Sequence, residues 1–227
     1  ILIDKKINMS KKIPNFFPRD YNKSSNIIIN NNSTENSITR LTNFVYNTNV
    51  NIYEDENYEF KQFIIFSEKD ITNHLRQNMR YFSAFLNSNS GILYFGINDN
   101  GDIIGIELTS ELKYSFELQL DKIIEAYDEH IKKNKNITYY FHEVQYTGKD
   151  KINHDNKIRY VIEINIKVGL PDHIYTTPYK EDESGDYECY IKLNGTVKKI
   201  YGESLFYYTK NKIMKQGKKL IKMIGIM

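Results

Sequence analysis

Hydrophobic and polar positions follow first a strand period and then a helix period between residues 58 and 87. Tyr58 to Ile65 alternates and then becomes apolar, which predicts a strand. Ser67 suits the N-cap of a following helix, because its hydroxyl accepts an unpaired backbone N–H and acidic residues come directly after it. We expect this helix to end near Asn87. Its buried stripe is predicted from apolar residues at helical spacing, namely Ile71, Leu75, Met79, Phe82, Phe85 and Leu86.

The rest of the pattern predicts one more helix among several strands. Residues 92–97 are a short apolar run, and the Asn and Gly residues at 98–101 favour a turn, so residues 102–106 are expected to return as the second strand of a hairpin. Hairpins among helices are typical of an α+β fold. We therefore expect a mixed, mostly antiparallel sheet with two main helices packed on it and an additional C-terminal helix. The other predicted elements are a helix at 110–133, strands at 137–146, 158–168, 187–193 and 197–201, and a helix from residue 203 onward.

Composition divides the chain into three parts. Residues 1–51 contain a polar, low-complexity tract at 30–37 that cannot bury apolar surface, so we expect a disordered arm. Residues 52–208 hold the predicted elements and are expected to form one domain. Residues 209–227 are rich in lysine and have no acidic residue, so a basic helix or tail is expected there.

Overall charge and cysteine content exclude few classes of function. The net charge of +2 argues neither for nor against a nucleic-acid partner. A single cysteine, Cys189, excludes an internal disulfide framework and a cysteine-rich zinc site, and it fits a reducing, intracellular setting. We expect the cytoplasm, with the nucleus as an alternative. No run approaches the ~18 apolar residues that a membrane span needs, so no membrane association is expected.

Three carboxylates are the candidate catalytic and metal-binding residues. Glu54 and Glu59 would point to opposite faces of a continuous strand, so they converge only if the chain bends at 55–57. Asp99 lies in the predicted turn beside that strand. Carboxylate oxygens suit Mg²⁺ or Mn²⁺, and such an ion activates water and stabilises charge on a phosphate. From the residues alone an alternative stays open, in which Glu54 belongs to a solvated acidic run and Asp99 only makes the turn.

Four motifs occur in order along the chain, namely Glu59-Phe60-Lys61-Gln62-Phe63, Ala84-Phe85-Leu86-Asn87-Ser88, Gly91 to Gly101 with Ile104-Gly105, and Tyr190 to Thr196. This ordered set resembles the AlbA-type domain of the Schlafen family. The resemblance covers about Tyr53 to Tyr208. Viral Schlafen-like proteins, including those of poxviruses, are similar in their single-domain scale, and the Asn-, Lys- and Ile-rich composition suits an AT-rich viral genome.

The resemblance implies an RNA-directed activity. Some Schlafen members are endoribonucleases that act on structured RNA such as tRNA, and their two glutamates and one aspartate match Glu54, Glu59 and Asp99. The same domain has also been described as an ATP-binding module. The glycines at 96, 101 and 105 are not followed by the Gly-Lys-Ser/Thr of a P-loop, so no motif supports ATP as a cofactor.

Two departures from the family pattern affect the expected partners. Active vertebrate members pair two such lobes in one chain, whereas this chain matches one lobe. A second lobe would therefore come from a homodimer or from a heterodimer with another Schlafen-like lobe. Those members also hold zinc with Cys and His, but His142, His154, His173 and Cys189 do not reproduce that spacing, so zinc is not expected.

Basic residues near these motifs are candidate nucleic-acid contacts. Lys61 shares a strand face with Glu59, so we expect it either to neutralise the carboxylates or to contact a phosphate. Lys192, Lys198 and Lys199 flank the turn at 194–195 and are expected to contact a phosphate backbone. The C-terminal lysines either form a solvated tail or add nonspecific, salt-sensitive RNA affinity.

Two classes of function follow from these observations. The first hypothesis is an RNA-binding protein with metal-dependent endoribonuclease activity. The second is a catalytically silent module that binds nucleic acid or a protein partner, such as a viral protein that dimerises with a host Schlafen. An ATP-binding regulator ranks third. The first two hypotheses differ in whether Glu54, Glu59 and Asp99 must meet in space.

Overall fold

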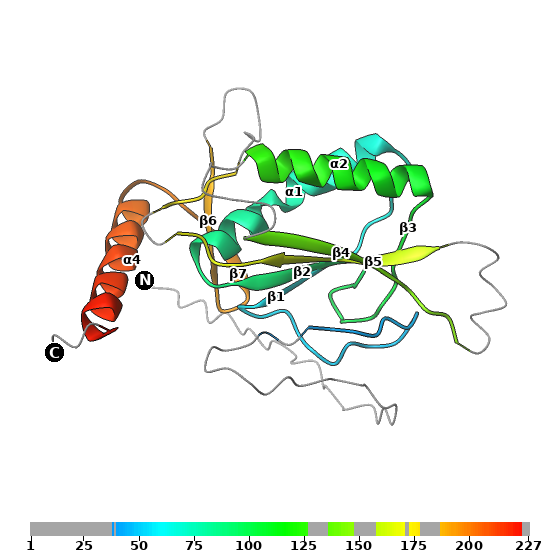
Figure 1. Cartoon of the computed structure of the whole chain (residues 1–227), viewed down its shortest axis with the longest axis horizontal. Helices are drawn as coiled ribbons and strands as arrows, with labels where there is room; N and C mark the ends of the chain where they lie inside the picture. The colour runs from blue at the N-terminus through cyan, green and yellow to red at the C-terminus, as the bar shows by residue number, and fades with distance from the viewer. Residues whose placement is uncertain are drawn as a thin grey trace, which may run out of the picture.

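The main sheet has five strands, and two helices lie on one of its faces (Figure 1). The computed structural model describes residues 38, 40–126, 136–147, 158–170, 173–177 and 187–223, and the structural statements here refer to those residues. The strands are β1 (Tyr58–Lys61), β2 (Gly91–Phe95), β3 (Ile106–Glu107), β4 (Ile137–Glu143) and β5 (Arg159–Ile166).

Strand β5 is the centre of this sheet. Strands β2 and β3 pair with one edge of β5 and β4 pairs with the other, all antiparallel, while β1 pairs with β2 in parallel. The sheet is therefore mixed and mostly antiparallel, and the predicted α+β class is confirmed. The register aligns Tyr94, Glu163 and Tyr140 in one row across β2, β5 and β4. Because side chains alternate along a strand, this row lies on a single face of the sheet.

Helices α1 (Glu68–Asn87) and α2 (Ser110–Ala126) cover the opposite face with an apolar core. The predicted N-cap is confirmed, since the Ser67 hydroxyl accepts the N–H of Asp70 at 3.3 Å. The predicted stripe is also buried, from Ile71 to Leu86. Helix α2 is described as far as Ala126, so the predicted extension to residue 133 lies outside the described residues.

The predicted hairpin is present, but it is shorter than expected. The Gly101 N–H donates to the Asn98 carbonyl at 2.8 Å, which closes the turn. Beyond it, the returning chain forms an antiparallel bridge with the outgoing chain between Ile97 and Ile103, and the N–H groups of Ile104 and Gly105 donate to the Gly96 carbonyl before the two segments diverge. The reason is competition: both edges of β2 are already taken by β1 and β5, so the returning chain reaches β5 as β3 instead. The predicted strand 58–65 similarly ends at Lys61, where its partner β2 ends.

A two-stranded sheet and a third helix complete the described fold. Strands β6 (Cys189–Leu193) and β7 (Thr196–Ile200) form the small sheet, and α4 (Gly202–Met223) projects from it (Figure 1). The predicted C-terminal helix is thus confirmed. The side chain of Asn87 joins α1 to this sheet, because its Nδ2 donates to the carbonyls of Tyr175 at 2.7 Å and Tyr190 at 3.0 Å. Asn87 is buried, so these bonds satisfy an amide that would otherwise be costly to bury.

Residues 40–51, here called the strap, pack on the face of the sheet that the helices leave free (Figure 1). Phe44 and Val50 are buried there against the outward-facing side chains of the sheet. The prediction of a disordered arm is corrected for these residues, because they bury apolar side chains and pair their backbone with the folded domain. The polar tract at 30–37 lies outside the described residues.

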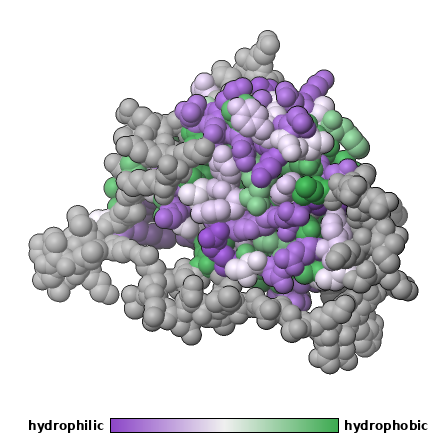
Figure 2. Space-filling view, turned by 45° about the vertical axis from the view of Figure 1, so that its right-hand side comes forward, coloured by the Kyte–Doolittle hydropathy of each residue, from purple (hydrophilic) through white to green (hydrophobic). Residues whose placement is uncertain are grey.

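The surface of the domain is mixed in character. Figure 2 shows hydrophilic and hydrophobic residues intermingled over the described part of one face. Within the described ranges, no helix is both long enough and apolar enough to cross a membrane.

Candidate nucleic-acid interface and carboxylate cluster

The chain bends between Glu54 and β1, as the odd spacing of the two glutamates required. The carboxylate of Asp55 accepts the N–H groups of Asn57 at 2.7 Å and Tyr58 at 3.0 Å, which closes a tight turn. Glu54 is then folded back onto the strand, where its Oε1 accepts the N–H of Phe60 at 2.8 Å. The bend predicted at 55–57 is therefore present.

Lys61 joins the two glutamates. Its Nζ lies 2.6 Å from Glu59 Oε1 and 3.1 Å from Glu54 Oε1. Burial lowers the pKa of Lys61, but the hydrogen bond and charge of Glu59 outweigh that effect and hold the pKa above its ordinary value. Of the two roles expected for Lys61, neutralisation of the carboxylates is the one observed.

Glu59 has a second lysine partner from the small sheet. Lys192 Nζ lies 2.5 Å from Glu59 Oε2 and 3.0 Å from the carbonyl of Tyr58, and both charged side chains are almost fully buried. Burial raises the pKa of Glu59, but hydrogen bonds from Lys192 and Lys61 outweigh it and lower the pKa. Lys192 thus differs from the sequence-based expectation: its ammonium faces Glu59 inside the fold and is not presented to a phosphate at the surface.

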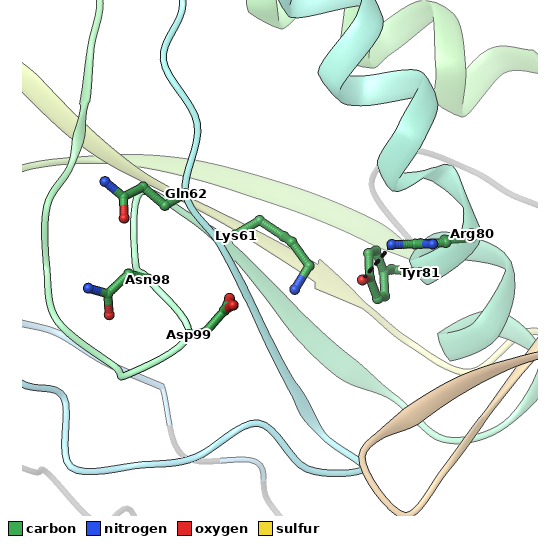
Figure 3. Close-up of a pocket in the computed structure, with 6 residues that line it drawn as sticks. All are labelled: Lys61, Gln62, Arg80, Tyr81, Asn98 and Asp99. Carbon is green, nitrogen blue, oxygen red and sulfur yellow. Dashed lines mark hydrogen bonds between the residues drawn. The ribbon is translucent and has the colours of Figure 1, made fainter.

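A pocket of ≈ 450 Å³ opens beside Lys61. Figure 3 shows Asn98 and Asp99 on one side of Lys61, carried by the turn after β2, and Arg80 and Tyr81 on the other side, carried by α1. Gln62 completes the lining. Arg80 and Asp99 are exposed, whereas Tyr81 is buried. The pocket therefore offers both positive charge and hydrogen-bonding groups to a ligand.

Arg80 and Tyr81 were missed by sequence reasoning. An Arg80 terminal nitrogen donates to the Tyr81 hydroxyl at 3.1 Å, and the guanidinium carbon lies 5.0 Å from the Tyr81 ring centroid. Burial and the charge of Glu59 raise the pKa of Tyr81, so its hydroxyl keeps its proton. Helical periodicity did not mark this pair as functional, because it identifies buried apolar positions and Arg80 lies on the polar side of α1.

The third carboxylate does not join the other two in a compact cluster. Asp99 lines the pocket, whereas Glu54 and Glu59 converge on the Lys61 ammonium. In the part of the chain that the structure describes, no three His, Cys, Asp or Glu side chains form a group that could hold a metal ion. The Mg²⁺ or Mn²⁺ site therefore stays a prediction.

The turn between β6 and β7 lies against the Glu54 bend. Asn194 and Gly195 both have positive φ, and a Cβ added to Gly195 would lie 3.5 Å from the Glu54 carbonyl oxygen. Lys198 and Lys199 are exposed on β7, and Lys199 pairs with Glu188. Neither lysine lines the pocket.

The backbone N–H groups of Gly96, Gly101 and Gly105 donate hydrogen bonds within the fold. The N–H of Gly96 donates to the Lys61 carbonyl, and the N–H of Gly105 donates to the Gly96 carbonyl, both at 2.8 Å. Gly101 closes the turn described above. These amides are engaged by the chain itself, so they do not form a cradle for phosphates.

A family model for "Schlafen, AlbA_2" matches residues 54–201, which include Glu54, Glu59, Asp99 and the residues that line the pocket. The chain belongs to the Schlafen AlbA-type family. The match to the Schlafen model begins at Glu54 and ends after β7, so the strap and α4 flank the matched region. A search of curated proteins found no match to the chain. Membership of the family suggests a nucleic-acid-binding function and leaves any catalytic activity to be tested.

Proposed function

We propose that this Schlafen-domain protein binds RNA at the Lys61 pocket and cleaves it as a metal-dependent endoribonuclease. One observation carries the proposal: Lys61 contacts both Glu54 and Glu59 and also lines the pocket that holds Arg80 and Asp99. Candidate phosphate-binding and candidate catalytic groups are thereby brought to one place from three separate segments of the chain.

Binding would rest on Arg80 and the amides around it. An exposed guanidinium forms strong, paired hydrogen bonds to phosphate oxygens, and its contact with Tyr81 orients it beside the pocket. Asn98 and Gln62 add neutral donors and acceptors suited to a sugar–phosphate backbone. Lys198 would extend the contact along β7. These groups read the backbone, so the proposal predicts recognition of RNA shape with little base specificity.

The donor set fits a divalent ion in its chemistry. Glu54 and Glu59 already direct carboxylate oxygens at one cation, the Lys61 ammonium, which shows that this position favours positive charge. Glu54, Glu59 and Asp99 would hold Mg²⁺ or Mn²⁺, which supplies activation of water and stabilisation of phosphate charge. Lys61 would then move its ammonium toward the phosphate, where it offsets the charge of the scissile group.

Cleavage of tRNA in the presence of Mn²⁺ tests the catalytic half of the proposal. Glu54→Gln and Asp99→Asn should each lower the cleavage rate by about a hundredfold or more, since each removes a carboxylate that is proposed to hold the divalent ion. Glu56→Gln is the matched control, because Glu56 is an exposed carboxylate in the same bend. Wild-type rates in both Glu54→Gln and Asp99→Asn would refute the catalytic assignment.

Binding is measured separately, by titration of labelled tRNA without a divalent ion. Arg80→Ala should weaken Kd by roughly tenfold, about 1.4 kcal/mol, and should lower the slope of log Kd against log salt by about 1. Lys69→Ala is the control, since Lys69 is an exposed cation elsewhere on α1. Equal losses in both variants would mean that binding depends only on general charge and not on the pocket.

The second candidate function is a catalytically silent binding module. It is favoured by the engagement of Glu59 with both Lys61 and Lys192, which is the arrangement of a structural ion network. Under this proposal the protein binds tRNA in an Arg80-dependent manner, and wild type shows no cleavage with Mn²⁺. A second lobe supplied by a homodimer or by a host Schlafen would be detected as a doubled mass in light scattering.

A further inference from the structure

A buried carboxylate lies in the middle of the sheet face that the strap covers. Glu163 on β5 is fully buried, and its neighbours in the register are Tyr94 on β2 and Tyr140 on β4. His142 Nε2 lies 2.9 Å from its Oε2, and Asn165 Nδ2 donates to its Oε1 at 2.5 Å. A charge buried to this extent requires a positive partner, because an unpaired carboxylate in a protein interior is strongly destabilising.

The positive partner of Glu163 comes from the strap. Arg40 Nε donates to Glu163 Oε1 at 2.7 Å, across 123 residues of sequence. The guanidinium also lies over the Tyr140 ring, 4.6 Å from its centroid. One face is therefore stacked on an aromatic ring while an N–H meets a carboxylate, which is the environment that a planar guanidinium fills better than an ammonium.

The first half of the strap continues along the same face. The Leu41 N–H donates to the Tyr94 hydroxyl at 3.3 Å. The ring centroid of Phe44 lies 4.7 Å from that of His142. The backbone of Phe44 accepts the N–H of Gln145 at 2.8 Å, so this part of the strap is held as an added, partly paired strand.

The second half of the strap is tied to the turn that carries Asp99. The N–H of Val50 donates to the Gly101 carbonyl, and the N–H of Ile103 donates to the Thr48 carbonyl, both at 2.9 Å. Asn49 Nδ2 adds a bond to the Asn100 carbonyl at 2.7 Å. Only three residues separate Val50 from Glu54. The strap is thus connected to the turn that carries Asp99 and, through residues 51–53, to Glu54.

We infer that Glu163, His142 and Tyr140 form a guanidinium-binding slot on the sheet face that the strap covers. Arg40 occupies this slot and, through the strap, positions Glu54 and Asp99. Arg40 is a positioning residue, since it does not line the pocket. When Arg40 leaves the slot, the strap is held less firmly on the sheet. The hydrogen bonds that join Thr48 to Ile103 and Val50 to Gly101 then open more often.

Amide hydrogen exchange of the full chain, resolved by NMR, tests the slot without any RNA. Arg40→Ala should speed exchange at Val50 and Ile103 by at least tenfold. Lys69→Ala, the control, should leave both rates within twofold of wild type. The double variant Arg40→Gln with Glu163→Gln removes the buried charge together with its partner, so it guards against a general loss of folding and should show the same local acceleration. Unchanged exchange at both amides in both Arg40 variants would overturn the inference.

The effect of Arg40 on the pocket rests on the proposed function and is measured separately, as the Kd for tRNA. In Arg40→Ala, Kd for tRNA should weaken at least threefold, although Arg40 lies outside the pocket. A threefold loss with faster exchange supports positioning through the strap. Faster exchange with an unchanged Kd overturns the positioning of the pocket while the slot stands. If wild type itself fails to bind tRNA, the proposed function fails, and the exchange result still decides whether Arg40 anchors the strap.

Discussion

The ion pair between Glu59 and Lys192 offers a test of stability. Removal of the Glu59 charge leaves Lys192 without a charged partner, whereas removal of Lys192 leaves Glu59 paired with Lys61. Glu59→Gln leaves the Lys192 ammonium almost fully buried, with the Tyr58 carbonyl and a neutral amide as its polar neighbours. Lys192→Met leaves the Glu59 carboxylate with Lys61 at 2.6 Å. Loss of the glutamate charge should therefore cost more than loss of the lysine.

The magnitude follows from burial. Removal of one partner from a buried ion pair costs about 3–5 kcal/mol, which we expect for Glu59→Gln. We expect about 1–3 kcal/mol for Lys192→Met, because Lys61 still pairs with Glu59 and the methionine fills most of the lysine volume. For a domain of this size each kcal/mol moves Tm by about 2–4 °C, so the Glu59→Gln loss corresponds to about 6–20 °C.

Urea unfolding, monitored by circular dichroism, gives the free energy of unfolding of both single variants and of the double variant. The double variant should be less destabilised than the sum of the two singles, since it leaves no unpaired buried ammonium. The reasoning is refuted if Lys192→Met costs more than Glu59→Gln, or if the two losses simply add. The outcome also matters for catalysis. A loss of activity in a Glu59 variant can be interpreted only together with its melting curve, so variants of Glu54 and Asp99 test the catalytic assignment more directly.

Three further predictions follow. Hydrogen bonds hold the pKa of Glu163 below its ordinary value despite burial, so its contribution to the free energy of unfolding is present above about pH 4.3 and is lost as pH falls through the lower, folded-state pKa. In acid, a plot of the free energy of unfolding against pH should have a shallower slope for Glu163→Gln than for wild type, and identical slopes would contradict this. Burial raises the pKa of the Cys189 thiol to about 11, so at pH 8 a thiol reagent should label it only after unfolding; rapid labelling of native protein would count against its burial. Gly105→Ala should lower stability by about 1–3 kcal/mol, since Gly105 has φ +70° and an added Cβ would lie 2.8 Å from Arg159 Cβ; a melting curve equal to wild type would disprove it.

The parts of the fold that depend on nearby residues could be predicted from the sequence. Helix α1 was predicted with its cap at Ser67 because capping and 3.6-residue periodicity are local properties. The bend before β1 was predicted because the odd spacing of Glu54 and Glu59 forbids convergence on a straight strand. Both predictions needed no knowledge of the rest of the chain.

The parts that depend on distant partners could not be predicted. The hairpin is shorter than expected because β5, about seventy residues later, takes the edge of β2 that the returning chain was expected to occupy. Lys192 was expected at the surface, but it is buried because it pairs with the Glu59 carboxylate, 133 residues earlier. The strap was expected to be disordered, since nothing in its own composition reveals that Glu163 needs Arg40. In each case the deciding contact joins segments whose pairing has no local signal.

The order of synthesis gives the Glu59–Lys192 pair a consequence of its own. A ribosome adds about 5–20 residues per second, so Glu59 emerges about 7–27 s before the lysine 133 positions downstream. During that interval a growing chain can form β1 and α1, but Glu59 has Lys61 alone as its counter-ion. Full burial of Glu59 is less favourable until β6 brings Lys192. The pocket region is therefore expected to close late in translation, and a chain interrupted before β6 would expose its carboxylates to solvent and to quality control.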